Sequence, residues 1–193
     1  IRRLESKLKF QLGILADLQG PKFRIGRVEE NVKLKVNDVF ILDKNKKIGS
    51  KKRVYLGHNE IYKSIKVNSI ILIDDGKLKL KVLSKRKDIL KTKVLVSGNL
   101  YSNKGVNLPN LILDTKPITV KDRNDLNFIL ENEIDWIALS FVQKVDDVKY
   151  VKKIIKNKKP LISKIEKPSA LNDLNQIIEL SDGIMVARGD LGV

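Results

Sequence analysis

The alternation of apolar and polar residues divides the chain into three stretches. In the first, residues 1–26, the apolar run Leu12–Leu18 is closed by Gly20-Pro21, which indicates a buried strand ending at a turn. The preceding Ile1–Phe10 mixes apolar and basic residues in a way typical of the end of a helix. We therefore expect the chain to open with a helix end followed by one strand.

The second stretch, residues 27–114, changes to a period of two. Apolar residues alternate with Lys in short segments, and Gly, Asn and Asp interrupt them, as in the turn sequence Asp74-Asp75-Gly76. This pattern predicts a compact antiparallel β-barrel or sandwich with the Lys side chains on its solvent-exposed face. The expected strands are Val32–Val36, Val39–Leu42, Arg53–Leu56, Ile70–Ile73, Leu78–Val82 and Leu90–Val96.

The third stretch, residues 115–193, has an alternating α/β pattern. Thr119 is a typical helix N-cap, and the helix that it begins is expected to run to about Asn132. Ile134–Phe141 reads as a strand, and Val145–Asn157 as a basic amphipathic helix.

The end of the chain, Leu161–Val193, predicts a strand, a helix and a second strand. Two short apolar runs, Leu161–Ile165 and Ile184–Ala187, flank a segment with apolar residues at helical spacing. Those apolar residues are Leu171, Leu174, Ile177 and Ile178. Because the block of short strands interrupts this α/β series, we expect an inserted domain at 27–114 between the segments 1–26 and 115–193.

Charged residues gather where the last two predicted strands end. Lys164 and Glu166 lie two positions apart, so in a strand they point to the same face, about 6.6 Å apart along the chain. Asp190 follows the second strand beside Gly189, where the main chain can approach a ligand closely. Two carboxylates without His or Cys nearby favour Mg²⁺ or Mn²⁺, and an adjacent lysine suits negative charge developing on a phosphoryl group or an enolate. The alternative is a surface Lys–Glu pair and an ordinary turn.

Polar residues also end two earlier strands, at Asp17 and Ser140. Ligands of parallel α/β folds bind outside the carboxyl ends of the strands, so these residues are expected at the same edge as Lys164. No Gly-rich dinucleotide loop is present, which favours a (β/α)₈ barrel over a doubly wound sheet. The predicted fold class is α/β, a partial (β/α)₈ TIM barrel with an inserted antiparallel β-barrel domain.

The net charge of +16 raises the question of a nucleic-acid partner. However, the 39 basic residues comprise 31 Lys and 8 Arg, and Arg is the residue that reads bases and phosphates bidentately. A solvated Lys-rich surface is therefore favoured over a nucleic-acid face.

Without cysteine, a membrane-length apolar run or a signal-peptide core, we expect a soluble cytoplasmic protein with no membrane partner.

The single histidine and the single tryptophan have simple expected roles. His58 lies beside Gly57 in a presumed turn and is expected at the surface. Trp136 lies in an apolar strand and is expected in the core.

Six motifs along the chain resemble the pyruvate kinase family. In chain order they are LADLQGPKFRIG, IDDGKL, NKGVNLPN, DWIALSFVQ, ISKIEKPSAL and MVARGDLGV. The resemblance covers essentially the whole chain and keeps the family's order. It implies a TIM barrel with an inserted β-barrel lid domain, and transfer of a phosphoryl group from phosphoenolpyruvate to ADP, giving pyruvate and ATP in glycolysis.

The resemblance also implies roles for the residues at the strand ends. Lys164 would neutralise the phosphoryl group in flight and the enolate oxygen, and Glu166 with Asp190 would bind Mg²⁺ or Mn²⁺. The main chain at Gly189, with Lys164 and Asp190, would hold the substrate. Arg24 would reach the nucleotide phosphates and act in catalysis with Lys164.

In the lid, the resemblance implies that Lys104 clamps the nucleotide phosphates.

Lys22 occupies the place where potassium-dependent members of the family have Glu. In this respect the chain resembles the branch of the family that needs no K⁺. The monovalent-cation site would then be formed by Asp17, Leu18 and Lys22, with the Lys22 ammonium replacing K⁺.

The family's remaining barrel strands lie outside residues 1–193. The resemblance therefore implies a longer parent enzyme, a homotetramer, and we expect this chain alone to be inactive, because so few strands cannot close an eight-stranded barrel. Two alternatives remain open. One is a Mg²⁺-dependent aldolase or lyase acting on a pyruvate enolate, and the other is a basic β-barrel module that binds RNA through 27–114.

Overall fold

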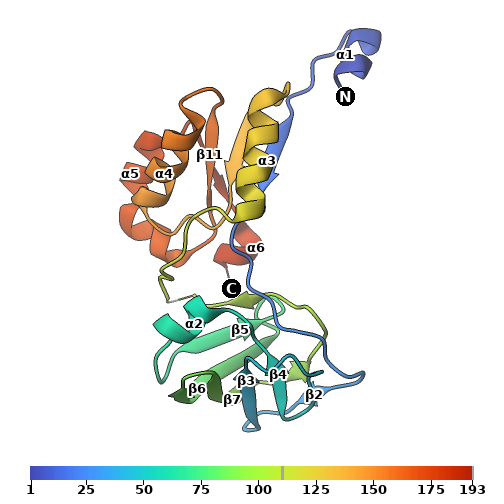
Figure 1. Ribbon diagram of the computed structural model, residues 1–193, viewed down its shortest axis with the longest axis vertical. Helices are drawn as coiled ribbons and strands as arrows, with labels where there is room; N and C mark the ends of the chain where they lie inside the picture. The colour runs from blue at the N-terminus through green and yellow to red at the C-terminus, as the bar shows by residue number, and fades with distance from the viewer. Residues whose placement is uncertain (110, 193) are drawn as a thin grey trace. The chain divides into compact units, whose positions relative to one another are not determined.

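The computed structural model describes residues 1–109 and 111–192, which form two compact units (Figure 1). The first unit is built from Ile1–Pro21 and Lys116–Leu191. The second is built from Lys22–Thr115 and is thus inserted into the first along the chain. Each unit has its own hydrophobic core.

A four-stranded parallel sheet forms the centre of the first unit, in the order β1-β10-β11-β12. Its strands are β1 (Leu15–Leu18), β10 (Trp136–Leu139), β11 (Leu161–Ile165) and β12 (Gly183–Val186). Each strand coincides largely with a predicted apolar run. The two middle strands bury Ile137, Leu139 and Leu161 completely. Because the strands are parallel, all four carboxyl ends lie at one edge of the sheet. The predicted α/β class with a parallel sheet is confirmed.

Helices cover this sheet, and α4 packs beside α5 (Figure 1). They are α3 (Val120–Glu131), α4 (Val145–Ile155), the 3₁₀ helix η1 (Pro168–Asp173), α5 (Leu174–Leu180) and the short α6 (Arg188–Leu191). Thr119 caps α3 as predicted, and its hydroxyl accepts the Asp122 amide while the Asp122 carboxylate accepts the Thr119 amide. This capping box satisfies main-chain donors that the first helical turn leaves unpaired.

Helix α1 (Arg2–Leu8) stands apart from the sheet in Figure 1 and has no buried residue. The Arg2 side chain fastens it to the turn before β10, donating to the Glu133 carbonyl and to the Asp135 carboxylate. Trp136 lies beside this turn and is 38% exposed, so its predicted core position is wrong. It is the first residue of β10, and the core begins one residue later, at Ile137.

The second unit is a curled six-stranded sheet in the order β4-β3-β7-β6-β5-β9, together with a two-stranded β2-β8 ladder. The strands are β2 (Lys33–Leu34), β3 (Val39–Asp43), β4 (Arg53–Tyr55), β5 (Ile70–Ile73), β6 (Leu78–Arg86), β7 (Ile89–Val96), β8 (Gly98–Asn99) and β9 (Val106–Asn107). Pairing is antiparallel except between β3 and β4, which run parallel. One helix, α2 (Asn59–Ser64), follows β4.

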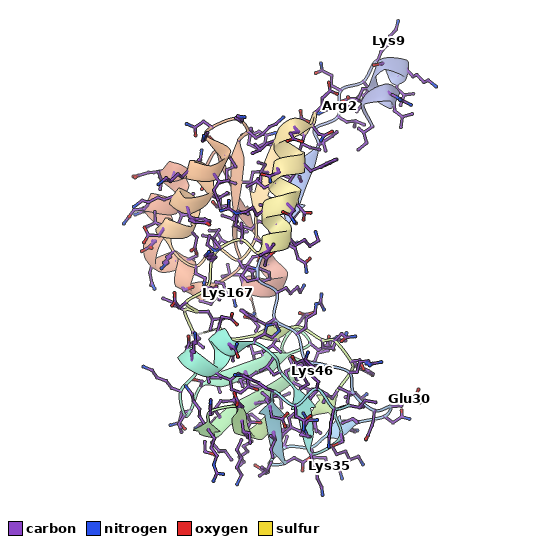
Figure 2. The ribbon with its side chains drawn as sticks, viewed as in Figure 1. Arg2, Lys9, Glu30, Lys35, Lys46 and Lys167 are labelled. Atoms are coloured by element: carbon purple, nitrogen blue, oxygen red, sulfur yellow. The ribbon has the colours of Figure 1, made fainter. Side chains whose placement is uncertain are left out.

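The predicted alternation of this unit is confirmed in β6. Leu78, Leu80 and Val82 are fully buried, while Lys79 and Lys81 between them stay partly exposed. Lys35 and Lys46 of the same unit, labelled in Figure 2, are exposed.

An irregular segment, residues 24–28, joins the two edges of the curled sheet and is called the closing segment below. On the β9 side, the Ile25 amide donates to the Lys104 carbonyl at 3.0 Å, and the Asn103 amide donates to the Gly26 carbonyl at 3.1 Å. On the β4 side, the Gly26 amide donates to the Tyr55 carbonyl at 2.9 Å. The sheet is therefore closed by main-chain hydrogen bonds to this segment.

Candidate active site

Lys164 is the centre of a polar cluster at the carboxyl edge of the parallel sheet. Its Nζ lies 2.8 Å from Asp17 Oδ2 and 3.0 Å from Ser140 Oγ. The Ser140 hydroxyl in turn donates to Asp17 Oδ1 at 3.1 Å. Three neighbouring strands, β1, β10 and β11, thus bring together three residues that lie far apart in the sequence. This juxtaposition is the one that the strand-end pattern predicted.

Glu166 is the fourth member of the cluster. Its side chain is only 3% exposed, and Oε1 lies 3.1 Å from Lys164 Nζ. Oε2 accepts the main-chain amide of Phe141 at 2.9 Å. Both carboxylate oxygens therefore have a donor, which offsets the cost of burying a charge. Phe141 follows Ser140 in a left-handed conformation with φ 56°, and this conformation belongs to the turn that aims its amide at Glu166.

The surroundings of Lys164 keep its ammonium charged. Burial by itself lowers the pKa of Lys164, but the hydrogen bond to Asp17 and the charge of Glu166 act in the opposite direction, and the net effect is a raised pKa. The cluster therefore presents a fixed cation at the edge where ligands of parallel sheets bind. Such a cation can stabilise negative charge that develops on a bound group.

Gly20 and Asp122 support this cluster, and the sequence reasoning did not single them out as site residues. Gly20 has φ 68°, and a Cβ there would lie 3.0 Å from Phe141 Cδ2 and 3.3 Å from the Ser140 carbonyl oxygen. The Gly20 amide donates to Asp122 Oδ1 at 3.2 Å, and Asp122 is completely buried. Only a glycine permits this close approach, so the Gly-Pro signal marked more than the end of a strand.

The described residues supply one of the two predicted metal ligands. Glu166 is a hard oxygen donor, and each of its oxygens has an acceptor site beyond the donor already bound. The side chain of Asp190 lies outside the described residues. Gly189 belongs to α6, directly after β12, and a Cβ at Gly189 would have open space around it. Among the side chains that the structure describes, no group of three or more His, Cys, Asp or Glu could hold a metal ion.

The second unit holds the predicted phosphate clamp, Lys104, in an ion pair. Lys104 Nζ lies 2.9 Å from Asp74 Oδ1, and the Asp74 side chain is only 7% exposed. Lys77 also contacts Asp74, at 3.2 Å. The hydrogen bond from Lys104 lowers the pKa of Asp74 against the opposing effect of burial, and Lys77 adds to the lowering. Asp74 is therefore an anionic anchor for two lysines.

Arg24 lies next to Lys104 in the same unit. An isolated β-bridge pairs Arg24 with Gly105, and an Arg24 guanidinium nitrogen donates to the Asn103 carbonyl at 2.8 Å. The Arg24 amide donates to His58 Nε2 at 3.2 Å. His58 is partly buried and hydrogen-bonded, so its expected place as a simple surface residue is wrong.

The residues predicted for a monovalent-cation site are close in sequence but belong to two different compact units. Asp17 and Leu18 belong to β1, where Leu18 is 1% exposed. Lys22 is exposed and begins the second unit. Within the first unit, the cation at the Asp17 carboxylate is Lys164.

Comparison with known proteins places the chain in a family. The family model "Pyruvate kinase, barrel domain" matches residues 1–193. The chain belongs to the pyruvate kinase family. Pyruvate kinases from Methylorubrum extorquens and Agrobacterium vitis are 47% and 45% identical to it, each over 100% of this chain and 41% of their own length. A crystal structure of a pyruvate kinase from Cryptosporidium parvum superposes with a TM-score of 0.91 at 33% identity, covering 100% of this chain and 42% of that one.

The chain thus spans about two fifths of the length of the pyruvate kinases that it matches. The recognised motifs and the partial barrel with its inserted β-domain agree with this match. Within the described residues, no helix is both long and apolar enough to cross a membrane.

Proposed function

We propose that this chain is the part of a pyruvate kinase that carries the catalytic lysine, and that the complete enzyme transfers a phosphoryl group from phosphoenolpyruvate to ADP. The observation that carries the proposal is the charged Lys164 at the carboxyl edge of the sheet, within hydrogen-bonding distance of Asp17 and Ser140. It lies in a chain that matches the family over its whole length. The proposed reaction belongs to glycolysis, and we place it in the cytoplasm.

In this proposal Lys164 neutralises the transferring phosphoryl group and then the enolate oxygen. Asp17 and Ser140 fix the direction of its Nζ, so that no reorganisation is needed when charge develops. Glu166 and Asp190 would hold a Mg²⁺ or Mn²⁺ ion, for which oxygen donors are suited. Such an ion supplies charge neutralisation at the transferring group when bound. The main chain at Gly189 would help to hold the substrate carboxylate.

The second unit acts as a lid in this proposal. Arg24 and Lys104 lie on adjoining main-chain segments, which supports a shared role at the phosphates of ADP and ATP. Asp74 neutralises Lys104 while no phosphate is bound. A nucleotide phosphate would compete with Asp74 for the lysine, and lid closure would exclude water and strengthen that interaction.

Two further features of the complete enzyme are proposals from the family resemblance. We propose that it needs no K⁺, because the Lys22 ammonium takes the cation's place at Asp17 and Leu18. We also propose a homotetrameric parent enzyme.

A chimaera tests the proposed activity. Residues 1–193 replace the matching segment of the Methylorubrum extorquens relative, which is 47% identical. Pyruvate release is followed by coupling to lactate dehydrogenase, with and without ADP and over a series of K⁺ concentrations. We expect ADP-dependent pyruvate formation without K⁺ activation, and a loss of about 10²–10³-fold in kcat for Lys164→Met, by comparison with other lost transition-state donors.

Three results would count against the proposal. They are a folded chimaera without ADP-dependent turnover, equal activity of the Lys164→Met chimaera, and aldol cleavage in place of phosphoryl transfer. Residues 1–193 alone are expected to show no turnover in the same assay, because they supply four parallel strands toward an eight-stranded barrel. Strong K⁺ activation would refute only the role of Lys22.

A further inference from the structure

The one histidine of the chain lies where the closing segment meets the end of β4. His58 precedes α2 as its N-cap residue, three positions after the last residue of β4. Its ring packs edge-on against Phe23, with ring centroids 4.9 Å apart and an interplanar angle of 83°. Phe23 belongs to the hydrophobic core of the second unit, so this contact fixes the imidazole ring.

His58 continues the closure of the sheet after β4 has ended. The next two amides of the closing segment, those of Ile25 and Gly26, donate to main-chain carbonyls at Lys104 and Tyr55. The Arg24 amide instead donates to a side chain, the Nε2 atom of His58, at 3.2 Å. The imidazole of His58 therefore accepts the Arg24 amide, whereas main-chain carbonyls accept the amides of the next two residues.

This hydrogen bond requires a neutral imidazole, because a protonated Nε2 is a donor and cannot accept the Arg24 amide. Burial lowers the pKa of His58, while the nearby charge of Glu60 acts in the opposite direction. Arg24, whose amide His58 accepts, is also charged, and its guanidinium donates to the Asn103 carbonyl. Near neutral pH the ring is thus held in the form that accepts.

We propose that His58 is a positioning residue for the nucleotide: by accepting the Arg24 amide, it holds the guanidinium beside Lys104, so that both cations face the phosphates of one nucleoside diphosphate. This inference rests on the proposed role of Arg24 at those phosphates. Protonation of His58 releases the Arg24 main chain and weakens nucleotide binding.

Nuclear magnetic resonance on the 193-residue chain tests the hydrogen bond without any nucleotide. The ring signals of the sole histidine give its pKa directly, and the Arg24 amide shift is followed between pH 8 and 5. We expect the Arg24 amide to titrate together with His58. His58→Gln keeps an acceptor at the same reach but does not titrate, so its Arg24 amide should stay constant. His58→Phe keeps the contact with Phe23 and removes the acceptor.

The same spectra, recorded during titration with ADP and Mg²⁺, test the positioning role. For His58→Phe we expect ADP to bind about three- to tenfold more weakly at pH 8, the loss expected for one hydrogen bond. Wild-type affinity should fall by the same factor as the pH drops below the pKa of His58. His58→Gln should show only the pH dependence of ADP itself, which makes it the matched control.

The possible outcomes separate the two proposals. An Arg24 amide that ignores the titration of His58, or a His58→Phe variant that binds ADP as the wild type does at every pH, overturns the positioning role. If ADP shifts no signal near Arg24 at any pH, the nucleotide role of Arg24 falls, and the positioning proposal with it. The amide titration still reports on the hydrogen bond in that case, so the two failures are distinguishable.

Discussion

Replacing Lys164 by Met should strongly destabilise the first unit, because it strands a buried carboxylate. Methionine preserves most of the side chain's length and removes its charge. Glu166, 3% exposed, would keep only the amide of Phe141 as a donor. Breaking a buried ion pair from one side costs about 3–5 kcal/mol. The Asp17 side chain is 53% exposed, so its half of the interaction contributes less than about 1 kcal/mol.

Because Lys164 itself retains 13% exposure, we expect the lower end of that range, a loss of about 3 kcal/mol in the free energy of unfolding. Urea denaturation followed by fluorescence measures it. The sole tryptophan, Trp136, lies in β10 and reports on the first unit. The double variant Lys164→Met/Glu166→Gln should recover much of the loss, because the buried charge is gone. Asp17→Asn is the control for an exposed partner and should change stability little.

The pKa shift supplies an independent check. The folded-state pKa of Lys164 is raised above its usual 10.5, so the folded state binds this proton more tightly than the unfolded chain does. The ion pair's contribution is therefore complete below pH 10.5 and is lost as the pH rises through the raised pKa. Lys164→Met should lack this alkaline loss. A cost below about 1 kcal/mol for the single variant, or no recovery in the double variant, would refute the reasoning about a buried charge.

Three further predictions concern supporting residues. Gly20→Ala should lower the free energy of unfolding by about 1–2 kcal/mol, because φ is 68° and the new methyl group would lie 3.0 Å from Phe141 Cδ2. Urea denaturation followed by tryptophan fluorescence measures this loss, and an unchanged midpoint would contradict it. Tyr62→Phe should leave the second unit as stable or up to about 1 kcal/mol more stable, as its buried hydroxyl has no hydrogen-bond partner among the described residues; a clear loss by thermal unfolding would contradict this. The pKa of Asp74 is lowered in the folded state, so its ion pair with Lys104 stabilises the second unit fully above the unfolded-state pKa of about 4, and this contribution is lost as the pH falls through the lower folded-state pKa. Hydrogen exchange of the wild type and of Asp74→Asn, compared over this pH range, measures the contribution. Equal acid sensitivity of the two proteins would contradict the prediction.

Local patterns were sufficient to predict most strands and the capped helix α3. In β6, alternation placed Leu78 and Leu80 inside and Lys79 at the surface, because the period of a strand is fixed by its geometry. At Thr119, the cap and its Asp122 partner lie three residues apart and are readable in sequence. The rule that ligands bind at the carboxyl ends of parallel strands also predicted that Asp17, Ser140 and Lys164 lie at one edge of the sheet, where they meet.

Other features depend on partners that no local pattern reveals. The two-residue strand β9 is too short to show any period, and its pairing with β5 joins positions far apart in the chain. His58 looked like a turn residue because its partner, the Arg24 amide, lies 34 positions away. Trp136 was expected in the core because it lies in a largely apolar segment, but it is the first residue of β10 and directly follows the charged Asp135, so its side chain stays 38% exposed.

The charge balance at Lys164 bears on what this cluster can do without help. One ammonium faces two carboxylates, Asp17 and Glu166, so the three side chains together carry a net negative charge. Such a cluster repels an anionic substrate unless further positive charge is present, because like charges repel. The repulsion is stronger where water is excluded. The proposed role of Lys164 at a phosphoryl group therefore requires further positive charge, which a divalent cation held by the Glu166 carboxylate would supply.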